Sequence, residues 1–77
     1  MRKLWEITEE ILHDWKNVNY AANHYVKAMR GMDYISDHYY QDSGHEIVSR
    51  FLANAGTWRG ETARRIKAEL RGMLNAN

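Results

Sequence analysis

The sequence predicts an all-α fold: a small bundle of three to four helices that forms one domain over residues 1–77 and associates as a homo-oligomer. No proline occurs in the chain, so no residue of that kind interrupts a helix. Hydrophobic side chains recur at steps of three and four, whereas β-branched residues are sparse. A chain of this length buries only about 60% of its unfolded surface. Without a cysteine or a metal cluster to compensate, self-association is expected to add stability.

The first helical pattern runs from Lys3 to Val18 and the second from residue 21 to Met32. In the first pattern, an apolar stripe lies on one side of the helix and glutamates lie on the opposite side, which is the pattern of an amphipathic helix. In the second, Gly31 is a stop signal. The two patterns fit two separate helices or one bent helix. The apolar stripe of the first pattern consists of Leu4, Ile7, Ile11, Trp15 and Val18.

Residues 33–42 are polar and aromatic with no sustained period, so they are predicted to form a loop with at most one helical turn. Ser43 and Glu46 then match a capping box, in which each side chain accepts from the backbone N–H of the other residue. A helix is therefore predicted from this point. Gly56 suits the left-handed position that often ends a helix.

The last predicted helix carries an apolar arc centred near Ile66 and begins after a cap at Thr57. At 100° per residue, Arg59 falls inside that arc, where a charged group is unexpected. Arg65 belongs to a ladder with Glu61 and Glu69 at (i, i+4) spacing, so its charge is expected to be neutralised. The opposite flank of the helix carries Arg64, Lys67 and Arg71.

The charge is distributed unevenly along the chain. Residues 1–42 carry five Lys or Arg against seven Asp or Glu, whereas residues 43–77 carry six against three. A surplus of this size is modest, and it does not match the heavily basic profile of a general nucleic-acid binder. No long apolar run occurs near the start, so the sequence predicts neither a signal peptide nor a membrane span and favours a cytoplasmic protein.

The candidate ligand-binding residues combine cationic and aromatic side chains. Guanidinium and ammonium groups one turn apart can follow phosphates or an acidic surface, and aromatic rings beside them can stack on a base. Each has a simpler reading: a solvated helix face for the cations, a core position for the tryptophan, and a protein interface for the tyrosines. The candidates are Arg59, Arg64, Lys67, Arg71, Trp58, Tyr39 and Tyr40.

Catalytic and metal-binding signatures are weak throughout the sequence. The four histidines, at positions 13, 24, 38 and 45, form no pair at the (i, i+4) spacing that presents two imidazoles to one metal. There is no cysteine nucleophile, no strand-turn-helix serine motif and no glycine-rich phosphate loop. The sequence therefore predicts a protein that is not an enzyme and that needs no metal or cofactor.

A helix, a sharp turn and a basic helix after Ser43 suggest a helix-turn-helix that reads DNA. The register fits poorly. If Gly56 is the turn glycine, then Leu52 stands where a small residue is usual, and Thr62 and Arg65 stand where apolar residues should join the two helices. DNA binding by this motif is an alternative.

Four runs after residue 41 form a pattern that is found in other sequences: Asp42–Gly44, Ile47–Val48, Phe51–Ala55 and Thr57–Leu70. With these runs, the chain resembles a group of short uncharacterised proteins encoded by bacteriophages and prophages. The resemblance covers most of the chain and is tightest after Asp42.

This resemblance implies an accessory protein of a phage or mobile element, acting in the cytoplasm of a host bacterium without enzymatic activity. Such proteins often inhibit or sequester host factors, including immune effectors and their nucleotide signals. The leading hypothesis is a protein that counters host defence by capturing a host factor or an anionic, nucleotide-type ligand. The alternatives are an inhibitor of a host defence complex, similar to an anti-CRISPR protein, and the DNA-binding regulator.

Overall fold

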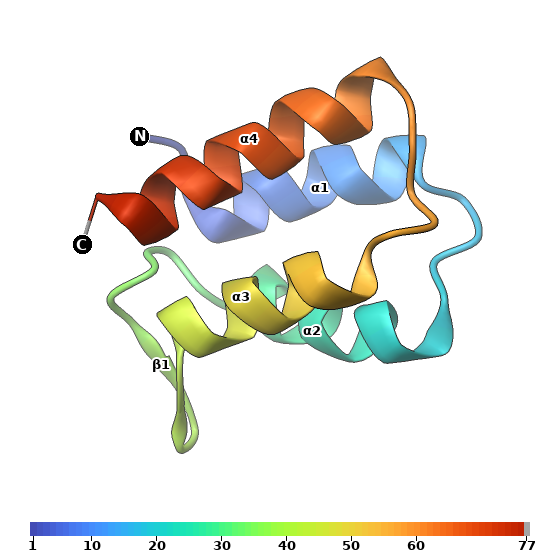
Figure 1. Cartoon of the computed structure of the whole chain (residues 1–77). Helices are drawn as coiled ribbons and strands as arrows, with labels where there is room; N and C mark the ends of the chain where they lie inside the picture. The colour runs from blue at the N-terminus through green and yellow to red at the C-terminus, as the bar shows by residue number, and fades with distance from the viewer. Residues whose placement is uncertain (77) are drawn as a thin grey trace.

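The computed structural model describes residues 1–76, which form four helices and one small antiparallel hairpin (Figure 1). The mainly helical prediction is therefore confirmed for the described residues. The elements are α1 (Leu4–Asp14), α2 (Tyr20–Arg30), β1 (His38–Tyr39), β2 (Asp42–Ser43), α3 (Gly44–Asn54) and α4 (Glu61–Asn75).

Consecutive helices run in opposite directions and form two layers, α1 with α4 and α2 with α3 (Figure 1). α1 packs against α2 and α4, and α3 packs against α2 and α4, so each helix contacts two others. The hairpin packs against the start of α3 and projects away from α4 (Figure 1). This arrangement separates the molecule into a side carrying α4 and an end carrying the hairpin.

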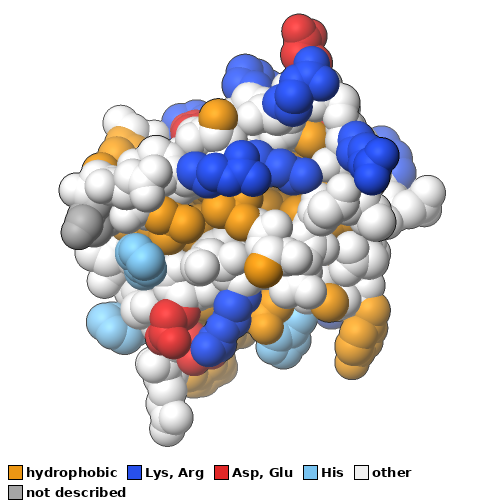
Figure 2. Space-filling view, viewed as in Figure 1, with side chains coloured by type: hydrophobic (Ala, Val, Ile, Leu, Met, Phe, Trp, Pro, Cys, Tyr) orange, Lys and Arg blue, Asp and Glu red, His pale blue; other side chains and the backbone are white. Residues whose placement is uncertain are grey.

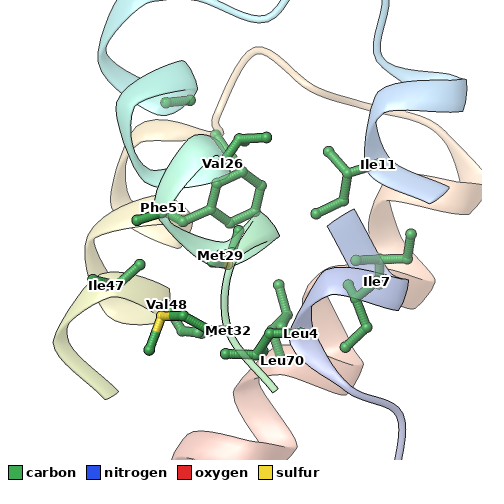
Figure 3. Packing of buried hydrophobic residues seen from close by; sticks show 14 of the residues in the cluster. Leu4, Ile7, Ile11, Val26, Met29, Met32, Ile47, Val48, Phe51 and Leu70 are labelled. Carbon is green, nitrogen blue, oxygen red and sulfur yellow. The ribbon is translucent and has the colours of Figure 1, made fainter. Parts of the chain in front are cut away.

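The core lies between the two layers and receives apolar side chains from all four helices (Figure 3). Phe51 is fully buried near its centre and is bordered by the edges of Trp15 and Trp58. Thr8, the one buried polar residue among residues 1–76, donates from Oγ1 to the carbonyl of Leu4 at 2.9 Å, so its hydroxyl is satisfied. The other labelled core residues include Ile7, Ile11, Val26, Met29, Ile47, Val48 and Leu70.

The two N-terminal helical patterns are separate helices. α1 ends at Asp14, before the predicted end at Val18, and Asn19 caps α2 by accepting from the backbone N–H of Ala22 at 2.8 Å. Asn19 also donates from Nδ2 to the carbonyl of Asn54 at 3.0 Å, which connects the start of α2 to the end of α3.

The first turn of α1 is closed by a distant part of the backbone. The N–H groups of Leu4 and Trp5 donate to the carbonyls of Asp33 and Met32 at 2.8 and 3.0 Å. Helix N-termini leave such N–H groups without intrahelical partners. Here the segment that follows α2 supplies the acceptors.

Residues 33–42 differ from the predicted loop, because His38 and Tyr39 pair with Ser43 and Asp42 in an antiparallel hairpin. Asp37 orders the turn that leads into the hairpin, since its carboxylate accepts from the N–H groups of Asp33 and Tyr34 at 3.2 and 3.0 Å. The strands have two residues each, too few to produce an alternating sequence pattern. The loop prediction is therefore confirmed for residues 33–37 and 40–41 and wrong for the short strands between and after them.

The start of α3 confirms the predicted capping box. The N–H of Glu46 donates to Ser43 Oγ at 3.1 Å, and the N–H of Ser43 donates to Glu46 Oε1 at 3.3 Å. Gly44 follows at a point of close approach, where an added Cβ would lie 2.5 Å from the carbonyl oxygen of Ile35. A glycine is therefore required there for steric reasons.

The corner between α3 and α4 departs from the prediction in two respects. α3 ends at Asn54, its C-cap is Ala55 with φ −103°, and Gly56 is not in the left-handed region. The N-cap of α4 is Gly60, at φ 112°, rather than Thr57, and it supplies no side-chain cap. Arg59 consequently precedes the helix and lies outside its apolar arc, so the predicted conflict does not arise.

Candidate functional site

The buried face of α4 determines which of its cations face solvent. Its apolar side chains are buried, and α4 packs against α1 and α3. Arg64 and Arg71 point away from this face and are exposed, as is Arg59 in the preceding turn. Figure 2 shows Lys and Arg side chains over α4, above a band of hydrophobic side chains. The buried residues of α4 are Ala63, Ile66, Leu70 and Met73.

Lys67 is directed into the corner that joins α3 to α4. Its ammonium donates to the carbonyls of Ala55 and Trp58, both at 2.7 Å, and lies 5.8 Å from the centre of the Trp58 ring. A cation at the end of a helix stabilises its free carbonyl groups. The predicted role of Lys67 in ligand binding is therefore corrected to a structural one.

Two nearby arginines change the pKa of the Lys67 ammonium. Partial burial lowers the pKa of its ammonium, and the positive charges of Arg71 and Arg59 lower it further. Arg59 and Arg71 therefore both act on the ammonium of Lys67. The sequence placed Arg59, Lys67 and Arg71 among the candidate cations, and in the structure these three interact electrostatically.

Trp58 belongs to the core, with only 2% of its surface exposed. Its ring stacks on Trp15 at 5.5 Å between centroids and an angle of 5°, and its Nε1 donates to Asp14 Oδ2 at 2.9 Å. The prediction that Trp58 offers a stacking surface to a ligand is corrected, because both its ring and its N–H are occupied within the chain.

Three arginines remain exposed on the α4 side: Arg59, Arg64 and Arg71, which we call the arginine face. Within residues 1–76 none of the three forms an ion pair. By contrast, Arg50 pairs with Asp42 and Glu46 at 3.8 and 3.5 Å. The arginine face therefore keeps its donors available to an external anion.

A network of ion pairs on the opposite flank of α4 was not predicted. Arg65 pairs with Glu10 of α1, rather than with Glu61 or Glu69 of its own helix. Arg2 pairs with Glu10 at 2.9 Å and with Glu69 at 2.6 Å. The Arg65 and Arg2 guanidinium groups hold the pKa of Glu10 below its ordinary value. Sequence spacing could not reveal these partners, since they depend on how α1 packs against α4.

The structure does not bring Tyr39 and Tyr40 to the arginine face. They lie at the tip of the hairpin, which projects away from α4 (Figure 1). Their rings meet edge to face at 4.8 Å, and Tyr40 is 87% exposed. The predicted site thus separates into an arginine face on one side and an aromatic pair at the other end.

No group of three or more His, Cys, Asp or Glu residues able to hold a metal occurs within the described chain. The surface formed by residues 1–76 contains no pocket. As far as the chain is described, none of its helices has both the length and the apolar character needed to cross a membrane.

Comparison of the chain with protein-family models, curated proteins and solved structures gives no match in any of the three.

Proposed function

We propose that this protein is a non-enzymatic accessory protein of a phage or mobile element that captures an anionic, nucleotide-type ligand of its host on the arginine face. The observation that carries the proposal is the exposure of Arg59, Arg64 and Arg71 without an ion-pair partner among residues 1–76. Guanidinium groups bind phosphates through paired N–H donors, which makes arginine well suited to this task.

The neighbourhood of the arginine face favours an anion more than the three side chains alone would. The Lys67 ammonium is within electrostatic range of Arg59 and Arg71, and the carbonyls of Ala55 and Trp58 hold it in place. Glu61 is the acidic residue of α4 within helical reach of Arg64, whereas Glu69 is held by Arg2. A phosphate approaching Arg59 and Arg71 would therefore meet three positive charges.

Calorimetric titration of the full chain tests this proposal, with cyclic di-AMP, cyclic di-GMP and ATP as probes and inorganic phosphate as the bare-anion control. At least one nucleotide is expected to bind more tightly than phosphate. Arg59→Ala and Arg71→Ala should each weaken binding by about tenfold, because each removes a charge-assisted hydrogen bond.

Arg30→Ala is the matched control, since Arg30 is an exposed arginine on α2, in the other layer of the bundle, and has no ion pair among the described residues. Its affinity for the nucleotides should equal that of the unchanged chain. Equal losses in Arg30→Ala and Arg71→Ala would reduce the effect to net charge and contradict a specific face. Absence of binding to every nucleotide would rule the proposal out.

The DNA-binding alternative gains no support from the arrangement of α3 and α4. A helix-turn-helix joins two steeply crossing helices by a short turn. Here α3 and α4 run in opposite directions side by side, and residues 55–60 connect them (Figure 1). The apolar face of α4 is also buried in the core.

A further inference from the structure

The hairpin tip holds a tyrosine in a backbone conformation that tyrosine disfavours. Tyr39 and Asp42 form the last pair of the hairpin, so Tyr40 is the first of two loop residues. Its φ of 58° makes it the one non-glycine residue with positive φ in the described chain. Glycine, asparagine and aspartate are favoured at such positions, since a bulky side chain there is strained.

Among residues 1–76, the one aromatic ring contact of Tyr40 is its edge contact with Tyr39. Tyr40 is 87% exposed and Tyr39 is 38% exposed, so neither contributes substantially to the core. Strained residues that persist without an internal benefit tend to serve recognition. Tyrosine is also one of the residue types that contribute most to protein interfaces.

The charges of the molecule are separated between the hairpin end and the α4 side. Residues 33–46 contain four acidic residues and no Lys or Arg, and Arg50 pairs with two of the four, Asp42 and Glu46. Residues 55–76 contain five Lys or Arg against two Glu. A hairpin end that carries carboxylates attracts a basic partner. It repels a partner that carries phosphate groups. The α4 side of another copy presents that basic surface. The acidic residues are Asp33, Asp37, Asp42 and Glu46.

We propose that the hairpin tip, Tyr39 and Tyr40, docks on the arginine face of a second copy of this chain, so that copies associate head to tail. Tyrosine rings stack on guanidinium groups, and the acidic residues around the hairpin complement Arg59 and Arg71 of the neighbour. Such an interface joins two different surfaces, so each added copy leaves one hairpin and one arginine face free. The assembly therefore closes into a ring or extends as a chain.

This inference does not depend on a nucleotide, although it uses the arginine face that the proposed function also uses. A nucleotide and a neighbouring hairpin would compete for Arg59 and Arg71. Tyr40→Gly distinguishes self-association from nucleotide binding, because it removes the exposed ring of the hairpin tip and leaves the arginine face intact. Nucleotide binding by this variant tests the proposed function alone.

Sedimentation velocity of the full chain tests the association, from micromolar to millimolar concentration in low salt. The average mass should rise with concentration and fall again when salt is added, since the interface is electrostatic. Tyr40→Gly should raise the dissociation constant of self-association by about tenfold or more. Glycine suits a positive φ, so the variant should keep the circular dichroism spectrum of the unchanged chain, and Tyr40→Asn provides a second variant with the same expectation.

A mixing experiment distinguishes head-to-tail association from any symmetric interface. Tyr40→Gly lacks the exposed ring of the tip and Arg59→Glu/Arg71→Glu lacks the arginine face, so each alone should associate more weakly than the unchanged chain by about tenfold or more. A mixture of the two restores one complete contact and should produce a two-copy complex that does not grow. Tyr20→Ala, which changes a 94% exposed tyrosine on α2, should associate as the unchanged chain does. A mixture that stays monomeric, or an unchanged chain that is monomeric throughout, would overturn the proposal.

Discussion

At the scale of single residues, three cations on the same side of α4 serve different purposes. Lys67 reaches inward because two carbonyl oxygens of the corner lie within its range, whereas Arg64 and Arg71 meet no such acceptor. Helical angles are sufficient to predict that all three leave the apolar face. They cannot predict the inward bend of Lys67, which depends on where the backbone of residues 55–58 passes.

Replacing Lys67 with methionine tests its structural role. Lys67→Met keeps most of the aliphatic packing but removes the donor shared by Ala55 and Trp58, so the free energy of unfolding should fall by about 1 kcal/mol. Lys27→Met on α2, an exposed position, should change it by less than about 0.5 kcal/mol. Urea denaturation measures both. Equal stability of the two variants would mean that the ammonium contributes nothing at the corner.

At the scale of elements, local side-chain rules predicted the start of α3 well and the hairpin poorly. The capping box of Ser43 and Glu46 forms because both partners lie within one turn of each other. The hairpin depends on Asp37 ordering a turn and on Tyr40 accepting a positive φ, and the second of these is disfavoured by residue type. Propensity rules fail where the backbone adopts a disfavoured conformation.

Two glycine substitutions should have opposite effects on stability. Gly44→Ala places a Cβ 2.5 Å from the carbonyl of Ile35, so the backbone must shift and the free energy of unfolding should fall by about 1–3 kcal/mol. Gly72→Ala meets no atom within 4 Å and lies inside α4, so stability should rise by about 0.5–1 kcal/mol. Thermal denaturation compares the two. A Gly44→Ala variant as stable as the unchanged chain would refute the close approach between the first residue of α3 and Ile35.

At the scale of the whole molecule, the sequence predicted a bundle of three to four helices, whereas the number four and the contacts that hold the helices together came from the structure. Apolar periodicity predicted which faces are buried, because the same face of each helix reaches a common core. The ion-pair network of Arg2, Glu10, Arg65 and Glu69 joins the start of the chain to α4. Its members lie up to 67 positions apart, so no local pattern connects them.

The network should make the fold sensitive to acid. Because Arg65 and Arg2 lower the pKa of Glu10 in the folded state, its ionised form is stabilised by folding. That contribution is complete above the ordinary glutamate pKa of about 4.3 and is lost as pH falls through the lowered value. Glu10→Gln should therefore lose stability at neutral pH and show a shallower decline between neutral and acidic pH. Urea denaturation at several pH values measures this.

High salt provides the control for that prediction. The network is partly exposed, so 1 M salt, with a Debye length of about 3 Å, should reduce the difference between the unchanged chain and Glu10→Gln at neutral pH. Identical pH profiles for the two proteins in low salt would show that Glu10 has no differential interaction in the folded state.

The backbone contacts at the start of α1 have a consequence for the kinetics of amide hydrogen exchange. First-turn amides of a helix normally exchange quickly, because nothing in the helix accepts them. Here the amides of Leu4 and Trp5 are bonded to Asp33 and Met32, so they can exchange only when α1 separates from the segment after α2. Their exchange should be as slow as that of core amides. The first residues of α1 thereby report on opening at the hairpin end, some thirty positions away in sequence.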